Sequence, residues 1–592
     1  MKLKGKMKKT IALIMFGIWM SAGIVSRAAA EDWKQQFAKA SDAYFDQVYF
    51  PYEPANATAT GYHRYDAQLE NYSRKNMDEE IAALKKFEAR IEAIHPDNAP
   101  ADFVPRSDRE IVLSNIRSQL LTLETIRPWE KDADNYSSTC ANGAFVLMER
   151  KFASPDDRLR SLIAREKQMP ALLNDARVNL NNPPRIFTEI AIEQLPGIVS
   201  FFETDVPAAF ADAKNPAVRA EFARTNGAVI AALKSYLDWL KTDLLKRSNG
   251  DFRIGAQAFS DKLKYDEMVD IPLDKLLDIG WADLHKNQAH FKEVAHELEP
   301  DKTPADVLEE LGRNHPAPDQ LLDAFRATFD GLVTFIRANH IVTIPSDVRP
   351  IVEETPAFMR ATTFASMDTP GPFETHAKEA YFNVTLPDPS MTPTEVEGFM
   401  HSFNIGTVTS TAVHEAYPGH YVQFLWLPQA PSKVRKILGA NTDIEGWAHY
   451  CEQMMLDEGY GQPGVGAKDE REAKFLRLGQ LQDALLRDAR FIVGIEMHTE
   501  QMTVPQAEAF FQREGYQSKE AAEIETKRGA GDPTYLYYTL GKLEIMKLRE
   551  DVKKKEGATF SLEKFHDDFL KQGFPPIKIV REALLGDNSP TL

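Results

Sequence analysis

Apolar residues recur at spacings of three and four along most of the chain, and this period predicts α-helices. Between Glu31 and about Asn339 the pattern is helical almost throughout, with stripes over residues 77–94, 111–126 and 159–180 that are separated by Asn- and Pro-rich breaks such as 181–184. Later helices are predicted near residues 443–458, 468–500, 504–513, 518–527, 534–552 and 560–571. Packing between helices is sufficient to explain these stripes. The pattern predicts a mainly α protein.

The pattern changes between Ile341 and Pro389. Prolines at 345, 350, 356, 370 and 372 exclude long helices from this segment. Residues 380–386 form the best strand candidate of the chain, and Pro387 ends it. The next residues, 392–395, read Thr-Pro-Thr-Glu, which is a capping box with proline at the first helical position and predicts a helix start.

No long linker, low-complexity run or internal repeat divides the rest of the chain. We therefore predict one helical domain over residues 31–592, with a helical N-terminal lobe (31–340) and a second lobe (341–592) that carries the candidate site described below. A small β-sheet edge is expected beside that site. The two lobes are expected to enclose a channel.

The N-terminus has the features of an export signal. Five lysines among the first nine residues precede an apolar run from Ile11 to Val25, and Ala28-Ala29-Ala30 follows. A membrane-spanning helix needs about 20 apolar residues, which is more than this run offers. No cysteine follows the run, so a lipid anchor is not indicated. We predict a signal peptide over residues 1–30, cleaved after about Ala30, and an exported protein, periplasmic or secreted, without a stable membrane anchor.

Composition narrows the class of protein. With 43% hydrophobic and 27% charged residues, the 592-residue chain is globular rather than disordered. Its net charge of −18 argues against nucleic acid as a partner. The two cysteines, Cys140 and Cys451, give no disulfide framework, and two unpaired buried thiols are at least as well supported as a disulfide.

The candidate chemistry begins at His-Glu-Ala-Tyr-Pro-Gly-His, residues 414–420. A neutral imidazole at His414 can bind a metal, and Glu415 beside it can take a proton from a water that the metal activates. In the usual His-Glu-x-x-His motif the two histidines are four residues apart, so they lie about 40° apart on one helical face. Here the second histidine, His420, is six residues on, roughly 120° away in an undisturbed helix.

Pro418 and Gly419 stand where such a helix would be distorted, since proline removes a hydrogen-bond donor and glycine permits unusual dihedrals. A local bulge at this point would bring His420 back toward the metal. If His420 is misdirected, His449 downstream or His401 upstream are the replacements.

A second polar segment follows at residues 445–452. Glu445, His449 and Glu452 lie at about 0°, 40° and −20° on a helical wheel, so they share one face. A purely structural explanation is that Thr442 and Glu445 form a capping box and that Glu452 pairs with an arginine. For this segment alone the structural explanation is favoured. When the segment is considered together with His414 and Glu415, a metal site is favoured.

At these two segments the chain resembles the bacterial domain-of-unknown-function 885 family. That family is marked by His-Glu-x-x-Pro-Gly-His followed by Glu-Gly-Trp-Ala-x-Tyr-x-Glu, which occur here as HEAYPGH (414–420) and EGWAHYCE (445–452). The resemblance extends over nearly all of the mature chain, through residues 51–66, 369–374, 481–498 and 537–541. The Pro-Gly insertion is therefore part of the family's own pattern.

The family in turn distantly resembles helical zinc peptidases, the thimet oligopeptidases and the thermostable bacterial carboxypeptidases. In those enzymes the third zinc ligand is a glutamate about thirty residues after the first histidine, with another glutamate seven residues further on. Glu445 lies 31 residues after His414, and Glu452 lies seven after Glu445. The resemblance implies one Zn²⁺ per chain on His414, His420 and Glu445, with Glu452 and His449 outside the ligands, where a carboxylate orients a histidine.

The same resemblance suggests residues that face the substrate. The Tyr-rich loop at 529–541 is expected to stabilise the oxyanion of a tetrahedral intermediate through Tyr538 or Tyr535, although core packing explains either tyrosine equally well. The strand at 380–386, with Tyr381 and Asn383, resembles the edge strand that lies beside the substrate backbone. Candidates for holding a substrate carboxylate are Arg490, His498 and Arg528.

These observations favour an exported zinc metallopeptidase that hydrolyses short peptides, with Glu415 as the general base. The alternative is a catalytically inactive protein of the same zincin-like fold that binds peptides or partners. Retention of Glu415 weighs against this alternative, since a pure binder needs no base. A structural helical protein with an accidental motif is disfavoured by the paired segments and their spacing. The choice between exo- and endopeptidase, the preferred side chains and the oligomeric state stay open.

Overall fold

The computed structural model describes residues 32–96, 102–360, 363–499 and 501–592, so the predicted signal segment, residues 1–30, lies outside the described residues. Helices hold 70% of the residues and strands 3%, which confirms the predicted mainly α class. None of the helices in the described ranges is long and apolar enough to cross a membrane.

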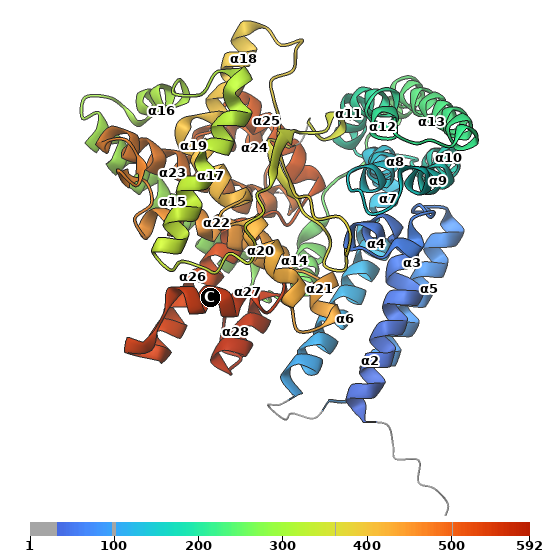
Figure 1. Cartoon of the computed structure of the whole chain (residues 1–592), viewed down its shortest axis with the longest axis horizontal. Helices are drawn as coiled ribbons and strands as arrows, with labels where there is room; N and C mark the ends of the chain where they lie inside the picture. The colour runs from blue at the N-terminus through green and yellow to red at the C-terminus, as the bar shows by residue number, and fades with distance from the viewer. Residues whose placement is uncertain (1–31, 97–101, 361–362, 500) are drawn as a thin grey trace, which may run out of the picture.

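The N-terminal helices gather on one side of the molecule (Figure 1, blue to teal). They bury two apolar cores of their own, one around Phe45 and Phe50 and one around Leu162 and Phe201. The predicted stripe at 159–180 is split into two helices, because the chain turns at residues 167–168 and Pro170 opens the second helix. The main helices of this group are α2 (Trp33–Tyr44), α5 (Arg74–Glu92), α6 (Phe103–Leu121), α8 (Ala133–Met148), α9 (Pro155–Glu166), α10 (Met169–Asn179), α11 (Arg185–Glu203) and α13 (Pro216–Thr242).

Packing crosses the predicted lobe boundary at residue 340. Four helices before it, α14 (Gly255–Asp266), α15 (Leu273–Leu298), α16 (Pro304–Gly312) and α17 (Leu321–Ala338), join the C-terminal part of the chain. Leu284 and Phe291 of α15 share a core with Leu485 and Ile492 of the long helix α23 (Glu470–His498). Apolar faces on both sides of residue 340 therefore belong to one body.

A three-stranded sheet lies in the proline-rich segment. Its strands are β1 (Ile351–Glu354), β2 (Ala365–Asp368) and β3 (Tyr381–Val384), in the order β1-β3-β2, with β1 parallel and β2 antiparallel to β3. The predicted strand at 380–386 is present, but the prediction that it is an edge strand is wrong. Both sides of β3 are already hydrogen-bonded to neighbouring strands, so its main chain at Tyr381 and Asn383 has no free edge for a peptide. The edge strands are β1 and β2.

The remaining helices carry the candidate site. The capping box at Thr392 and Glu395 is present and begins α18. The predicted helix at 504–513 has those bounds, and the others differ from prediction by a few residues. The helices of this part of the chain, besides α23, are α18 (Pro393–Met400), α19 (Ile405–Glu415), α20 (His420–Trp426), α21 (Lys433–Ile437), α22 (Asn441–Asp457), α24 (Val504–Arg513), α25 (Lys519–Gly531), α26 (Tyr537–Glu556), α27 (Leu562–Leu570) and α28 (Ile577–Leu585).

Two pairs of glycines let these helices cross with their backbones in contact. A Cβ added to Gly446 of α22 would lie 2.6 Å from the Cα of Gly541 in α26. A Cβ added to Gly479 of α23 would lie 2.4 Å from the Cα of Gly406 in α19. Because no side chain separates the crossing helices, α19, α22, α23 and α26 bring their polar residues close together around one centre.

Family-like stretches far apart in the sequence also pack on each other. His63 Nε2 lies 3.0 Å from Glu374 Oε2, and the Phe373 N–H donates to the Thr60 carbonyl at 3.1 Å. The segments 51–66 and 369–374 thus join the N-terminal helices to the segment that carries the sheet. Cys140 and Cys451 are both free and buried, which agrees with the expectation of two unpaired buried thiols.

Candidate metal centre

The Pro-Gly insertion breaks the helix instead of bulging it. Helix α19 ends at Glu415, the Tyr417–Pro418 peptide bond is cis, and α20 begins at His420. The Gly419 N–H donates to the Val413 carbonyl at 3.0 Å, and this hydrogen bond holds the turn against the end of α19. His414 in the last turn of one helix and His420 at the start of the next can therefore face the same point.

The three predicted ligands converge. His414 Nε2 and His420 Nε2 lie 3.2 Å and 3.3 Å from the same oxygen, Oε2 of Glu445. The two imidazoles stand nearly perpendicular, with ring centroids 4.8 Å apart. A tetrahedral ion with ligand distances of about 2.0–2.1 Å separates its ligand atoms by roughly 3.4 Å. The spacing of these donors therefore fits such an ion.

Glu452 lies against the first histidine. Its Oε1 lies 2.7 Å from His414 Nδ1, and its Oε2 lies 3.1 Å from His449 Nδ1. Arg487 of α23 completes the arrangement with Nη2 at 3.1 Å from Glu452 Oε1. With a proton on Nδ1, His414 keeps the Nε2 lone pair for the cluster. Glu452 therefore makes the ion pair with an arginine that the structural explanation predicted, and it also contacts the two histidines.

Charges in the centre favour a cation between the ligands. Burial acts to raise the pKa of Glu445, but the neighbouring His420 and His414 hold this pKa well below its usual range. Burial acts to lower the pKa of His414, but its hydrogen bonds to Glu445 and Glu452 raise this pKa to about 9. The carboxylates of Glu445 and Glu452 thus stabilise positive charge at the point where the imidazoles meet.

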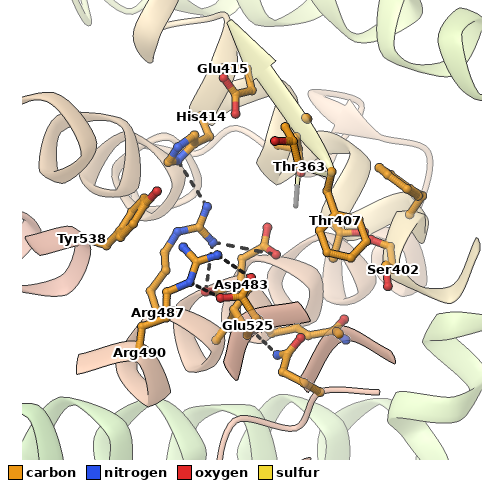
Figure 2. Close-up of a pocket in the computed structure, with 18 of the residues that line it drawn as sticks. Thr363, Ser402, Thr407, His414, Glu415, Asp483, Arg487, Arg490, Glu525 and Tyr538 are labelled. Carbon is orange, nitrogen blue, oxygen red and sulfur yellow. Dashed lines mark hydrogen bonds and ion pairs between the residues drawn. The ribbon is translucent and has the colours of Figure 1, made fainter. Parts of the chain in front are cut away.

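The centre opens into a cavity of about 730 Å³. Figure 2 shows His414 and Glu415 on one side of this cavity and Arg487 and Arg490 on another. All the residues that line it come from Ala305 onward, so the helices of the N-terminal group do not form its wall. The edge strand β2 contributes residues 365–367.

Glu415 is the acid best placed to act on a molecule in the cavity. It is buried, it lines the cavity, and among the described residues its carboxylate makes no hydrogen bond or ion pair. Burial raises the pKa of Glu415, which brings the carboxyl closer to the range of a general base that works near neutral pH.

The two candidate tyrosines lie in different places. Tyr538 lines the cavity, and its ring stacks near that of His414, with centroids 6.3 Å apart. Its hydroxyl accepts a hydrogen bond from Arg528 Nη2 at 2.7 Å, which leaves the hydroxyl proton free to point elsewhere. Burial raises the pKa of Tyr538 to about 12, so the group stays protonated and can donate. Tyr535 is fully buried and does not line the cavity.

The candidates for holding a carboxylate differ in the same way. Arg490 lines the cavity but is held by Glu525 in a two-pronged ion pair at 2.6 Å and 2.7 Å. His498 is buried against the Gly529 carbonyl at 2.8 Å and lies outside the cavity lining, as do Tyr381 and Asn383. Arg528 lines the cavity, and no carboxylate of the described residues lies within ion-pair distance of its guanidinium.

Sequence reasoning missed several cavity residues. Arg487, Asp483 and Glu525 were not singled out, although all three line the cavity. A pattern was available for part of this set: 483, 487 and 490 are spaced four and three residues apart, so they lie on one face of α23.

Comparison with known proteins places the chain in a family. A family model described as "Bacterial protein of unknown function (DUF885)" matches residues 54–584. The chain belongs to the DUF885 family. No curated protein matches it significantly.

Solved structures share the fold of this DUF885 protein. One is described as a "putative lipoprotein of unknown function" from Shewanella oneidensis, with a TM-score of 0.74 and 27% identity over 93% of this chain and 99% of that one. Another, a "putative lipoprotein" from Colwellia psychrerythraea, has a TM-score of 0.76 and 19% identity over 94% of this chain and 99% of that one. The mainly helical fold is thus common to these proteins.

Proposed function

We propose that this DUF885 protein is a zinc metallopeptidase that hydrolyses short peptides. The observation that carries the proposal is the meeting of His414, His420 and Glu445 at separations that suit one tetrahedral ion, with the unpaired carboxylate of Glu415 beside them. Two imidazoles and one carboxylate are a usual ligand set of catalytic zinc, which keeps a fourth position for water.

The orientation and the charge of the donors also suit Zn²⁺. Glu452 fixes the orientation of His414, as carboxylates do for zinc-binding histidines, and the charge of Glu445 favours a cation. When bound, the ion supplies Lewis acidity, which lowers the pKa of a water and polarises a carbonyl. The proposal holds one Zn²⁺ per chain at this centre.

The chain's own groups then handle the proton and the developing charge. Glu415 accepts a proton from the attacking water and passes it to the leaving amine. Tyr538 donates its free O–H to the oxyanion, and its hydrogen bond from Arg528 strengthens it as a donor. Tyr535 lacks access to the cavity and takes no part in the proposed reaction.

The cavity supports a peptide as substrate. The free edge of β2 offers main-chain hydrogen bonds to an extended peptide, in place of the β3 edge that the sequence predicted. Arg528, which has no carboxylate partner among the described residues, suits the terminal carboxylate of a short substrate better than Arg490, which Glu525 already occupies. A volume of about 730 Å³ suits a few residues, not a folded protein.

Export is part of the proposal. The lysine-rich start and apolar run of residues 1–30 support a signal peptide, and the two similar solved structures carry descriptions as lipoproteins. We place this protein in the periplasm or the medium after the signal peptide is removed.

The test combines metal content with turnover. Protein from Glu31 onward is expected to hold one zinc per chain at this centre, and His414→Ala and His420→Ala are each expected to bind one zinc fewer than the wild type. Glu415→Gln is expected to keep the zinc and to cleave a mixed short-peptide library roughly 100-fold or more slowly. Glu79→Gln, at an exposed glutamate of α5, is the matched control and retains both. Absence of zinc after reconstitution overturns the proposal, whereas zinc without any cleavage supports a peptide-binding protein.

A further inference from the structure

A second cluster of metal-binding side chains lies apart from the centre at His414. Glu397 Oε1 is 3.4 Å from His315 Nε2 and 3.5 Å from His401 Nε2. These residues come from the loop between α16 and α17, from α18, and from the short turn of helix at 401–403. Their ligand atoms all lie within 4.8 Å of one another, as do those of His414, His420 and Glu445.

The two clusters share the same geometry. In each, one carboxylate oxygen stands between two Nε2 atoms, at 3.2 Å and 3.3 Å in the first cluster and at 3.4 Å and 3.5 Å in the second. Roughly 3.4 Å is the separation expected between ligands of a tetrahedral ion. The second cluster therefore meets the same distance requirement as the first.

The histidines are oriented for metal by other contacts. His315 Nδ1 donates to the Pro316 carbonyl at 2.8 Å, which puts the proton on Nδ1 and leaves the Nε2 lone pair facing Glu397. His401 Nε2 is buried and makes no hydrogen bond among the described residues, and Glu397 Oε1 lies only within ion-pair distance of it, at 3.5 Å. A buried imidazole nitrogen without a partner is costly unless something binds it.

The backbone around the cluster is held in place. The Ile405 N–H donates to the Asn314 carbonyl at 2.9 Å, so the loop that carries His315 is tied to the start of α19. Gly312 leaves room for the His401 ring, because a Cβ there would lie 2.9 Å from the ring atoms Cγ and Nδ1. The ligands are thus positioned by contacts that do not depend on the metal.

We propose that His315, Glu397 and His401 form a second site for a divalent metal ion of the Zn²⁺ class. Imidazole and carboxylate donors suit such ions, and the half-exposed side chain of Glu397 leaves further coordination positions to water. Open to solvent on this side, the site exchanges its ion more readily than the buried centre at His414.

The place of the site gives it a structural role. His401 lines the cavity together with Leu308, Glu309 and Gly312 of α16. An ion at the cluster joins the His315 loop to α18 and so fixes α16 against the cavity. Glu309, whose Oε2 lies 4.0 Å from His401 Nδ1, adds negative charge that favours a cation here.

The test is made in a background without the first centre. The double variant His414→Ala, His420→Ala is dialysed against a small excess of Zn²⁺, and metal per chain is measured after removal of free ion. One zinc per chain is expected to remain. Adding His401→Gln or His315→Gln is expected to remove it. His340→Asn is the matched control, because His340 faces only Glu563, at 3.3 Å, and completes no three-ligand cluster.

Two further measurements keep the result independent of peptidase activity. Co²⁺ in the double variant is expected to give the visible absorption of a low-symmetry site, and His401→Gln is expected to abolish it. Zinc is also expected to slow backbone hydrogen exchange over residues 309–318. A double variant that binds no zinc, or that binds it equally with and without His315 and His401, overturns the proposal. Melting temperatures measured in chelator separate misfolded variants from metal-free ones.

Discussion

Gly419→Ala is expected to abolish zinc binding at the His414 centre without touching a ligand. Gly419 stands between the two histidines, and an added Cβ would lie 1.8 Å from the His414 carbonyl oxygen and 2.4 Å from that of Val413. The turn must move away from the end of α19 to admit the methyl group.

The size of this movement decides the outcome. Contacts of a Cβ shorter than 3.0 Å are essentially never seen, so the distance of 1.8 Å requires a shift of roughly 1.2 Å. Metal sites tolerate ligand distances within about 0.2 Å of the ideal. A shift of this size at Gly419 carries His420 out of reach, and zinc affinity is expected to fall by more than the roughly 100-fold typical of losing an outer contact. Overpacking of the fold costs only about 1–3 kcal/mol.

The assay is zinc affinity by competition with a chromophoric chelator, together with the free energy of unfolding in chelator. Gly250→Ala is the control for the clash, because its Cβ would lie 2.3 Å from the Asn182 carbonyl oxygen, far along the chain from the centre. It is expected to lose stability and keep zinc. Gly227→Ala, inside α13 with nothing within 4 Å of its Cβ, is expected to keep the zinc affinity and to raise the free energy of unfolding by about 0.5–1 kcal/mol. Zinc affinity in Gly419→Ala equal to that of the wild type would refute this reasoning.

Three further outcomes are expected. Asp108→Asn leaves the fully buried Arg435 without its ion-pair partner at 3.0 Å, so unfolding in urea is expected to need about 3–5 kcal/mol less, and a loss below about 1 kcal/mol contradicts this. Burial raises the pKa of Glu166 from 4.5 to about 8, so its protonated form favours the folded state, and this stability is lost as pH rises through that window. Relative to Glu166→Gln, the wild type is expected to lose about 1.4 kcal/mol per pH unit between these values, and a constant difference contradicts the assignment. Arg528→Gln is expected to raise KM for peptides with a free C-terminus more than for their amidated forms, and equal changes would rule out a carboxylate contact.

Local patterns predicted much of this molecule. The capping box at Thr392 begins a helix, and the shared face of Glu445, His449 and Glu452 is real, because both depend on residues close in sequence. The spacing of 31 residues from His414 to Glu445 also corresponds to a contact in space.

Features set by tertiary packing were beyond such patterns. Arg487 of α23 meets Glu452 of α22 through the packing of two helices, a contact that no periodicity reveals. The edge strand β2 reads Ala-Ser-Met-Asp, without the β-branched or aromatic residues that mark strands, so the prediction fell on the richer β3. The turn at Gly419 is held by its hydrogen bond to Val413 and by one that Trp447 Nε1 donates to the Pro418 carbonyl at 3.0 Å, and the insertion alone does not encode the second.

The backbone contact between α22 and α26 makes one side of the cavity stiff. Gly446 and Gly541 leave no side chain between the two helices that could rearrange and let one slide past the other. Glu445 and Tyr538, which these helices carry, therefore keep a fixed separation whatever enters the cavity. The opposite side is formed by the edge strand β2 and by α16. We expect the cavity to widen on that side when a molecule enters or leaves, while the positions of Glu445 and Tyr538 stay unchanged.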